Sequence, residues 1–182
     1  GNGSNTENII KYFNKKSLKI DWVIITNNPN AGVLEKSKKL KVPCLIINKE
    51  QFNDGSSLSI IEEIKPSLII LAGFLLKISE SILEKFSNKI INIHPSLLPK
   101  FGGKGMYGMN VHNKVIKNFE KESGITIHFV NKNYDEGKII FQKKIAIEYP
   151  CSSENLAKKI HKLEMHFFPL IIEEIIKSFD YE

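Results

Sequence analysis

Short apolar runs, each closed by polar or turn-forming residues, recur through the first half of the chain and alternate with segments of helical spacing. We expect strands at 20–26, 42–47, 68–72 and 90–94, and helices at 31–40 and 57–64. Nearly uniform apolar strands separated by helices are typical of a parallel sheet with both faces covered and right-handed crossovers. The pattern therefore predicts an α/β fold with a mostly parallel, twisted sheet.

The pattern changes in the second half, where apolar and polar residues alternate at 125–130 and again at 138–147. Two such strands joined by 131–137 predict a C-terminal antiparallel hairpin. A helix is expected at 110–119, and helical spacing resumes after residue 153, with Pro169 predicting a kink or a break. We see no internal repeat or linker and expect a single domain over residues 1–182.

Asn92 and His94 lie two residues apart at the end of the strand at 90–94, just before Pro95. Side chains two apart in a strand share one face, and open α/β sheets bind ligands at the carboxyl ends of their strands. An amide beside an imidazole can hold an oxyanion and move a proton. The alternative is a strand end whose His and Asn only satisfy the backbone of a turn.

Two further stretches suit a ligand. The opening Gly1-Asn2-Gly3-Ser4-Asn5 leads into an amphipathic helix, and such a loop presents N–H groups and a helix dipole to a phosphate, although the same residues also make ordinary loops. No strand precedes this loop in the sequence, so we expect the first strand of the fold to be absent.

The apolar loop at 73–76 suits a flat apolar ligand or plain core, and 101–109 is too rich in glycine for regular structure.

Composition narrows the classes of partner. The net charge is +6, but all 26 basic residues are Lys, so the Arg fork that reads guanine is missing and the lysines indicate solvated helix faces. The longest apolar run, at 68–76, is much shorter than the roughly 20 residues that span a bilayer. Two isolated cysteines, Cys44 and Cys151, favour a reducing cytoplasm. We expect neither a nucleic-acid nor a membrane partner.

Other catalytic arrangements fail on spacing. His161 and His166 are five residues apart, whereas a helix-borne zinc pair needs ligands four apart, so we expect no metal. No Cys-x-x-Cys pair and no Gly-x-Ser-x-Gly elbow is present.

The run Asn92-Ile93-His94-Pro95-Ser96-Leu97-Leu98-Pro99-Lys100, with Leu71-Ala72-Gly73-Phe74 before it and Asp135-Glu136-Gly137 after it, resembles the folate-dependent phosphoribosylglycinamide formyltransferases of purine biosynthesis. The resemblance spans essentially the whole chain and implies a Rossmann-like formyltransferase fold. It also implies formyl transfer from 10-formyltetrahydrofolate, as co-substrate, to the amino group of glycinamide ribonucleotide without a metal. The implied enzyme is cytoplasmic, a monomer or a homodimer.

The resemblance also assigns the site residues. Asn92, His94 and Asp135 correspond to the catalytic trio, in which Asn92 and His94 hold the oxyanion and Asp135 orients the imidazole and favours its charged form. The nucleotide phosphate and ribose are assigned to Gly3, Ser4, Asn5 and Glu164, and the folate to Leu75, Leu76, Ile78, Asn92, Val130 and Asp135.

The chain departs from the family pattern in the glycine-rich 102–108 stretch, which is a few residues longer than in better-known members, and at His161, which stands where glutamine is common. Three rival functions remain as expectations to test. They are a methionyl-tRNA formyltransferase, which carries an extra carboxyl-terminal domain, a formyltetrahydrofolate deformylase, which lacks the proline after the motif histidine, and an inactive binding homologue.

Overall fold

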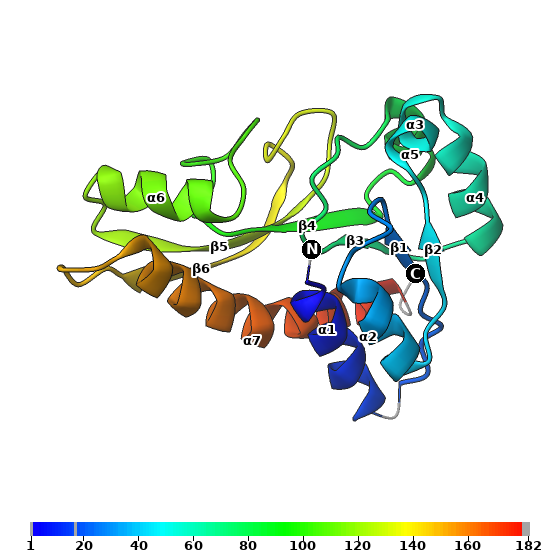
Figure 1. Cartoon of the computed structure of the whole chain (residues 1–182), viewed down its shortest axis with the longest axis horizontal. Helices are drawn as coiled ribbons and strands as arrows, with labels where there is room; N and C mark the ends of the chain where they lie inside the picture. Colours follow the sequence, from blue (N-terminus) through cyan, green and yellow to red (C-terminus); the bar gives the residue numbers. More distant parts are fainter. Residues whose placement is uncertain (1, 17, 180–182) are drawn as a thin grey trace.

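The computed structural model describes residues 2–16 and 18–179 (Figure 1). Gly1, the first residue of the expected phosphate loop, lies outside these residues. The strands are β1 (Ile24–Thr26), β2 (Cys44–Ile46), β3 (Ile69–Leu71), β4 (Ile90–His94), β5 (Glu122–Phe129) and β6 (Ile139–Ala146). The helices are α1 (Ser4–Asn14), α2 (Val33–Leu40), α3 (Lys49–Asn53), α4 (Ser56–Ile64), α5 (Glu80–Lys85), α6 (Met109–Lys117) and α7 (Ser153–Phe179).

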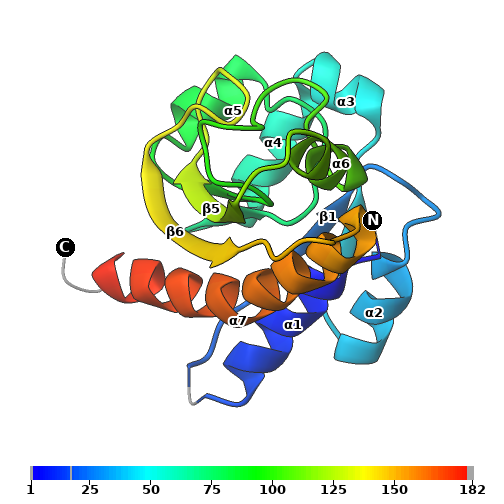
Figure 2. The ribbon, with the colours of Figure 1, turned by 90° about the vertical axis from the view of Figure 1, so that its left-hand side faces the viewer.

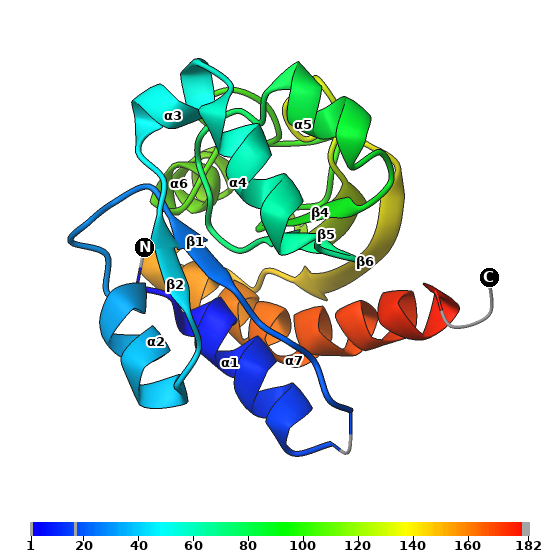
Figure 3. The ribbon, with the colours of Figure 1, turned by 90° about the vertical axis from the view of Figure 1, so that its right-hand side faces the viewer.

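The larger sheet has the order β3-β4-β5-β6, in which β3 pairs parallel with β4 and the β5–β6 hairpin continues the sheet antiparallel. β1 and β2 form a separate parallel pair. Helices α1 and α7 lie on one side of the strands and α3, α4 and α5 on the other (Figures 1 and 3). This architecture confirms the predicted α/β class and its C-terminal hairpin.

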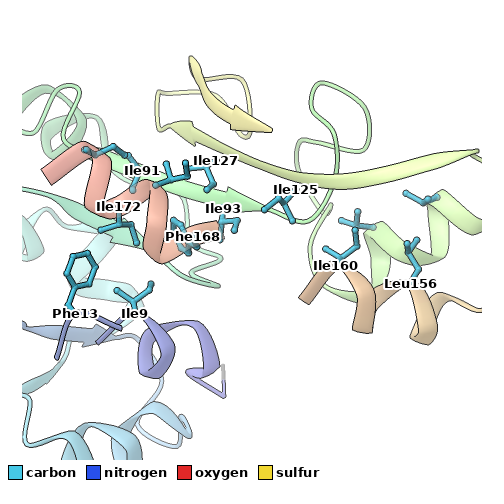
Figure 4. Packing of buried hydrophobic residues seen from close by; sticks show 14 of the residues in the cluster. Ile9, Phe13, Ile91, Ile93, Ile125, Ile127, Leu156, Ile160, Phe168 and Ile172 are labelled. Carbon is cyan, nitrogen blue, oxygen red and sulfur yellow. The ribbon is translucent and has the colours of Figure 1, made fainter. Parts of the chain in front are cut away.

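The strand β4 divides its side chains between two faces. Ile91 and Ile93 belong to the main apolar cluster, where they pack with residues of β5, α1 and α7 such as Phe13 and Phe168 (Figure 4). Ile90 belongs instead to a second cluster formed with α3, α4 and α5. Because side chains alternate along a strand, Asn92 and His94 share the face of Ile90. The core thus fixes the register that presents both polar residues on one side.

The long helix α7 continues through Pro169, so the expected break is wrong (Figure 2). Proline has no N–H and leaves the carbonyl four residues earlier without its helical donor. That carbonyl belongs to Met165, and the Asn8 side-chain Nδ2 of α1 donates to it over 2.6 Å. The neighbouring helix therefore supplies a donor to the carbonyl that proline leaves unpaired, which lets α7 continue past Pro169.

A second polar contact joins the same two helices. The carboxylate of Glu173, on α7, accepts from Lys16 Nζ at 2.6 Å and from the Tyr12 hydroxyl, and Lys177 Nζ lies 2.8 Å from its other oxygen. Hydrogen bonds from Lys16, Lys177 and Tyr12 lower the pKa of Glu173 to about 2. The carboxylate is thus held ionised between α1 and α7 and fixes the C-terminal end of α1 relative to α7.

The helices α3 and α5 were not predicted from the pattern, because each is shorter than two turns and carries little periodicity. Local capping accounts for both. Asn48 and Gln51 form a capping box at α3, and the Ser79 hydroxyl accepts from the Ile82 N–H at α5. In the described residues the chain enters α1 directly from Asn2 and Gly3, with no strand before it. None of the described helices combines the length and the apolar character needed to cross a membrane.

The contact between Asn8 and the Met165 carbonyl can be tested by a double-mutant cycle. Asn8→Ala should lower the free energy of unfolding by about 1–3 kcal/mol, because it leaves a half-buried carbonyl without a donor. In a Pro169→Ala background the loss should shrink, since residue 169 then supplies an N–H. Denaturant unfolding of the four proteins measures the coupling, with Asn14→Ala, on the exposed side of α1, as the control. Equal losses in both backgrounds would contradict this role for Asn8.

Candidate active site

The site lies where β4 meets β5. In the antiparallel register Asn92 is opposite His128 and His94 is opposite Thr126. All four side chains lie on the face of the sheet that Ile91 and Ile93 leave free, because cross-strand partners share a face. Pairing of β4 with β5 therefore places two histidines and an amide side by side, at the carboxyl end of β4.

His94 is only 3% exposed, and both of its ring nitrogens face oxygen atoms. Nε2 lies 2.8 Å from the Phe101 carbonyl oxygen, and Nδ1 lies 3.5 Å from Asp135 Oδ2. A neutral imidazole has a single N–H, so it donates to one of these acceptors and presents a lone pair to the other. The shorter contact identifies Nε2 as the donor and leaves Nδ1 facing the carboxylate, ready to take up a proton.

Two opposing effects act on the charge of His94. Burial lowers the pKa of His94 below its ordinary value, while the Asp135 carboxylate and the Phe101 carbonyl act in the opposite direction. The charge of Glu164 also favours protonation, to a smaller extent. Since the net pKa is lowered, the ring is mainly neutral at pH 7, and a change in its surroundings readily shifts its protonation.

Asp135 lies in the loop between β5 and β6 with a left-handed backbone, φ 58°. Its Oδ2 accepts from the Gly103 N–H over 2.9 Å, whereas His128 Nε2 is 3.7 Å from Oδ1, too far for a strong hydrogen bond. Burial raises the pKa of Asp135, but His128, the charge of His94 and the Gly103 N–H together hold it below the usual range. Asp135 is therefore an ionised carboxylate fixed by the glycine-rich loop.

The close approach of that loop depends on Gly102. A Cβ atom at this position would lie 2.6 Å from Leu98 Cδ2 and 3.1 Å from the Cβ of Asp135. A side chain at this position would force Leu98 or the loop itself to shift, so glycine allows the loop to lie this close to Asp135. The glycine-rich 102–108 stretch thus begins with residues that touch the candidate site.

His128 fixes the orientation of Asn92. Its Nδ1 is 2.8 Å from the Phe129 carbonyl and its Nε2 is 3.2 Å from Asn92 Nδ2. A carbonyl can only accept, so Nδ1 carries the proton of the neutral ring and Nε2 accepts from the Asn92 amide. The second N–H of that amide remains available as a donor for a bound oxyanion.

A buried hydroxyl positions the turn after β4. Thr126 Oγ1 donates to the Ser96 carbonyl over 2.7 Å and accepts from the Leu98 N–H over 3.0 Å. Gln142 Nε2, from β6, donates to both Thr126 Oγ1 and the Leu98 carbonyl at 2.9 Å. Since Phe101 follows this turn, the network also places the carbonyl that faces His94.

The residues expected to bind the nucleotide surround the start of α1. Gly3 is the N-cap in a left-handed conformation, φ 67°, and no side chain caps the helix, so its first N–H groups are available to an anion. A Cβ at Gly3 would lie 2.7 Å from Val33 Cγ2, which gives the glycine a packing role as well. Ser4 and Asn5 open the helix beside it.

Asn5 and Glu164 come together, as a shared site requires. Asn5 Nδ2 donates to Glu164 Oε2 over 3.2 Å, and Asn5 Oδ1 is buried without a partner among the described residues. The same Glu164 oxygen is 3.1 Å from His161 Nδ1. His161 is thus placed as a neighbour of Glu164 by its spacing of three on α7.

The residues expected to bind folate differ in how exposed they are. Leu75 is 56% exposed, whereas Ile78 is only 7% exposed and belongs to the second apolar cluster, against which Leu76 and Val130 pack. Ile78 is therefore core in this structure and can support a ligand only from behind. Val130 donates its N–H to the Ile90 carbonyl, which places the start of the Asp135 loop against β4.

Several participants were missed by the sequence reasoning. His128 could have been found, since the alternation at 125–130 places it on one face with Thr126. The Phe101 carbonyl and the Gly103 N–H are backbone groups and leave no mark in the sequence. His112, on α6, is also buried, its Nδ1 has no hydrogen-bond partner in the part of the chain that is described, and burial together with the charge of His94 lowers its pKa.

No group of three His, Cys, Asp or Glu side chains converges in a metal-binding arrangement within residues 2–16 and 18–179. The nearest histidines to the site are instead engaged with backbone carbonyls, an amide and a carboxylate. The arrangement suits hydrogen-bond and charge stabilisation of an oxyanion.

The tautomer assigned to His128 is directly measurable. In the neutral ring, ¹⁵N NMR should find the proton on Nδ1 and a hydrogen-bonded, unprotonated Nε2. Asn92→Ala removes the donor and should move the Nε2 resonance toward that of a free acceptor, while Asn155→Ala, at an exposed position of α7, should leave it unchanged. A proton found on Nε2 would overturn the proposed orientation of Asn92.

The sequence matches the family model described as "Formyl transferase" over residues 1–172. It is 32% identical to the phosphoribosylglycinamide formyltransferase of Bacillus subtilis, covering 97% of this chain and 91% of that protein. It is 35% identical to the chloroplastic phosphoribosylglycinamide formyltransferase of Arabidopsis thaliana, but spans only 64% of its length. The crystal structure of phosphoribosylglycinamide formyltransferase from Anaplasma phagocytophilum superposes with a TM-score of 0.87 at 30% identity, covering 97% of this chain and 83% of that one. The chain belongs to the formyl transferase family.

Proposed function

We propose that the protein transfers the formyl group of 10-formyltetrahydrofolate to the amino group of glycinamide ribonucleotide, a step of purine biosynthesis. The observation that carries the proposal is the convergence of Asn92, His94 and Asp135 at the end of β4, in a chain that spans 91% of a relative named for this reaction. The Arabidopsis relative is named for the same reaction, and this chain covers 64% of it.

In this reaction the substrate amine attacks the formyl carbon and the carbonyl oxygen becomes an oxyanion. The free N–H of Asn92 donates to that oxyanion, with its orientation held by His128. The amine gives a proton to His94 as the new C–N bond forms, and that proton passes to the folate nitrogen as its bond to the formyl carbon breaks. His94 takes up a proton at Nδ1, where it faces the ionised Asp135, and adds a positive charge next to the oxyanion.

The division of labour between Asn92 and His94 follows from their contacts. His94 Nε2 already donates to the Phe101 carbonyl, so it reaches the oxyanion directly only if it releases that carbonyl. The Asn92 amide has a second N–H that can donate to the oxyanion. We therefore assign the direct hydrogen bond to Asn92 and the charge to His94, with Asp135 holding the imidazolium.

The nucleotide lies across the start of α1 in this proposal. Its phosphate binds the N–H groups after Gly3, at Ser4 and Asn5, where the helix dipole favours an anion. Its ribose hydroxyls bind Glu164, which Asn5 orients. The charge of Glu164 also favours protonation of His94, which supports a nucleotide whose ribose binds Glu164 and whose amine lies beside the catalytic groups.

The folate binds over the exposed Leu75 and the half-buried Leu76, with Val130 and the Asp135 loop opposite and Ile78 supporting them from the core. The proposed partners are the two small molecules alone. A cytoplasmic location is part of the proposal and rests on the free cysteines Cys44 and Cys151. The names of the relatives do not support it, since the Arabidopsis relative is named chloroplastic.

Incubation with glycinamide ribonucleotide and 10-formyltetrahydrofolate tests the proposal most simply. Formylated nucleotide should accumulate, and release of free formate without a nucleotide acceptor should be slow. Formylation of methionyl-tRNA at physiological salt would contradict the proposal and indicate a methionyl-tRNA formyltransferase. Formate release that needs no acceptor would contradict it and indicate a formyltetrahydrofolate deformylase.

Asp135→Asn keeps the shape of the side chain and removes its charge. We expect turnover to fall roughly 100-fold or more, because the carboxylate stabilises the imidazolium mainly in the transition state. Nucleotide affinity should stay within about threefold. Turnover and equilibrium binding are measured together, with Glu136→Gln, in the same loop but exposed, as the matched control. Near-normal turnover in Asp135→Asn would eliminate this role.

A further inference from the structure

The helix α2 lies against the start of α1, where the nucleotide phosphate binds in the proposed function. Figures 1 and 3 show the two helices side by side. They are closest at Gly3, where a Cβ atom would lie 2.7 Å from Val33 Cγ2. Lys36 follows Val33 by three residues, so it lies on the side of α2 that faces α1. The helix α2 therefore brings a cation to the first turns of α1.

Lys36 pairs with a carboxylate of α1. Its Nζ lies 2.5 Å from Glu7 Oε2, and Lys11 Nζ lies 2.6 Å from Glu7 Oε1. Hydrogen bonds from Lys11 and Lys36 lower the pKa of Glu7 to about 2, so this carboxylate is ionised at neutral pH. The Lys36 side chain is 27% exposed and that of Lys11 59% exposed, so solvent and salt screen the pair with Lys36 less.

Glu7 lies where a negative charge opposes a bound phosphate. Its N–H donates to the Gly3 carbonyl, which places the residue at the end of the first turn of α1. Helical side chains lean toward the N-terminus, so the carboxylate extends back toward the free N–H groups after Gly3. With a rise of about 1.5 Å per residue, its charge lies roughly 6–10 Å from an anion bound there, about one Debye length at physiological salt. An unpaired Glu7 would therefore compete with the phosphate for the positive end of the helix.

The two lysines reverse the sign of this charged group. One carboxylate and two ammonium groups give Glu7, Lys11 and Lys36 together a net charge of +1. A phosphate monoester carries a charge of about −1.5 to −2 at pH 7, so the group attracts it, whereas Glu7 alone would repel it. A nucleoside without the phosphate lacks this charge and should not respond to Lys36.

We propose that Lys36 is a positioning residue that makes the nucleotide site selective for a phosphorylated ligand, an inference that rests on the proposed function. Lys36 acts through its ion pair with Glu7, which cancels a carboxylate charge beside the phosphate. It does not need to touch the phosphate, whose direct partners are the N–H groups at the start of α1.

The test compares Lys36→Met with Lys39→Met, which removes the same charge from an exposed position in the last turn of α2. Binding of glycinamide ribonucleotide, and of the nucleoside obtained by removing its phosphate, is measured by NMR titration at physiological salt. Lys36→Met should weaken nucleotide binding at least about fivefold, because the Glu7 charge then opposes the phosphate. It should leave nucleoside binding within about twofold. Lys39→Met should change neither.

Glu7→Gln provides the rescue. In the double variant of Lys36→Met with Glu7→Gln, Lys11 alone is charged, so the group again carries +1. Nucleotide affinity should return to within about twofold of that of the unaltered protein. The loss caused by Lys36→Met alone should also shrink as salt is raised from about 50 to about 500 mM, because salt screens the carboxylate.

Three results would overturn the inference. They are equal losses of nucleotide and nucleoside binding in Lys36→Met, which a structural role would give, a loss that Glu7→Gln does not restore, and an equal effect of Lys39→Met. Failure of the unaltered protein to bind the nucleotide would remove the proposed function and this inference together. Normal nucleotide binding that Lys36→Met leaves unchanged would overturn the inference alone.

Discussion

The His94 ring is buried with an oxygen atom facing each of its nitrogens, the Phe101 carbonyl at Nε2 and the Asp135 carboxylate at Nδ1. A neutral ring satisfies only one of these acceptors, and the imidazolium satisfies both. Burial works against the charge, so the pKa of His94 is lowered in spite of both oxygens. The balance leaves a base that is mainly neutral at rest and whose cation finds two partners already in place.

This arrangement depends on parts of the chain that are far apart in sequence. Register in β4 places His94 on the polar face because Ile91 and Ile93 are held in the core. The glycine-rich loop supplies the Phe101 carbonyl and the Gly103 N–H, and the hairpin connection supplies Asp135. The stability of the sheet and the geometry of the site therefore depend on the same register of β4. A slip of one residue in β4 would exchange core and catalytic side chains.

The sequence was most informative where apolar and polar positions follow a regular pattern. The apolar run of β4, the alternation in β5 and the helical spacing in α2, α4 and α6 predicted those elements, with β4 at its observed bounds. The motif residues Asn92, His94 and Asp135 do converge. Pro169 misled, because the donor that replaces its missing N–H comes from Asn8, more than 150 residues away in sequence. Ile78, assigned to the ligand, is core, since apolar composition alone does not separate a binding wall from an interior one.

The central claim is that Asp135 favours the charged form of His94, and a pH titration of the His94 ring by ¹⁵N NMR tests it most directly. In the unaltered protein the ring should titrate below the ordinary histidine range, because burial opposes the charge, with Nδ1 gaining the proton. In Asp135→Asn the pKa should fall further, since the carboxylate that favours the imidazolium is gone while the burial stays. A His94 pKa that is unmoved or raised by this substitution, or protonation that begins at Nε2, would contradict the account.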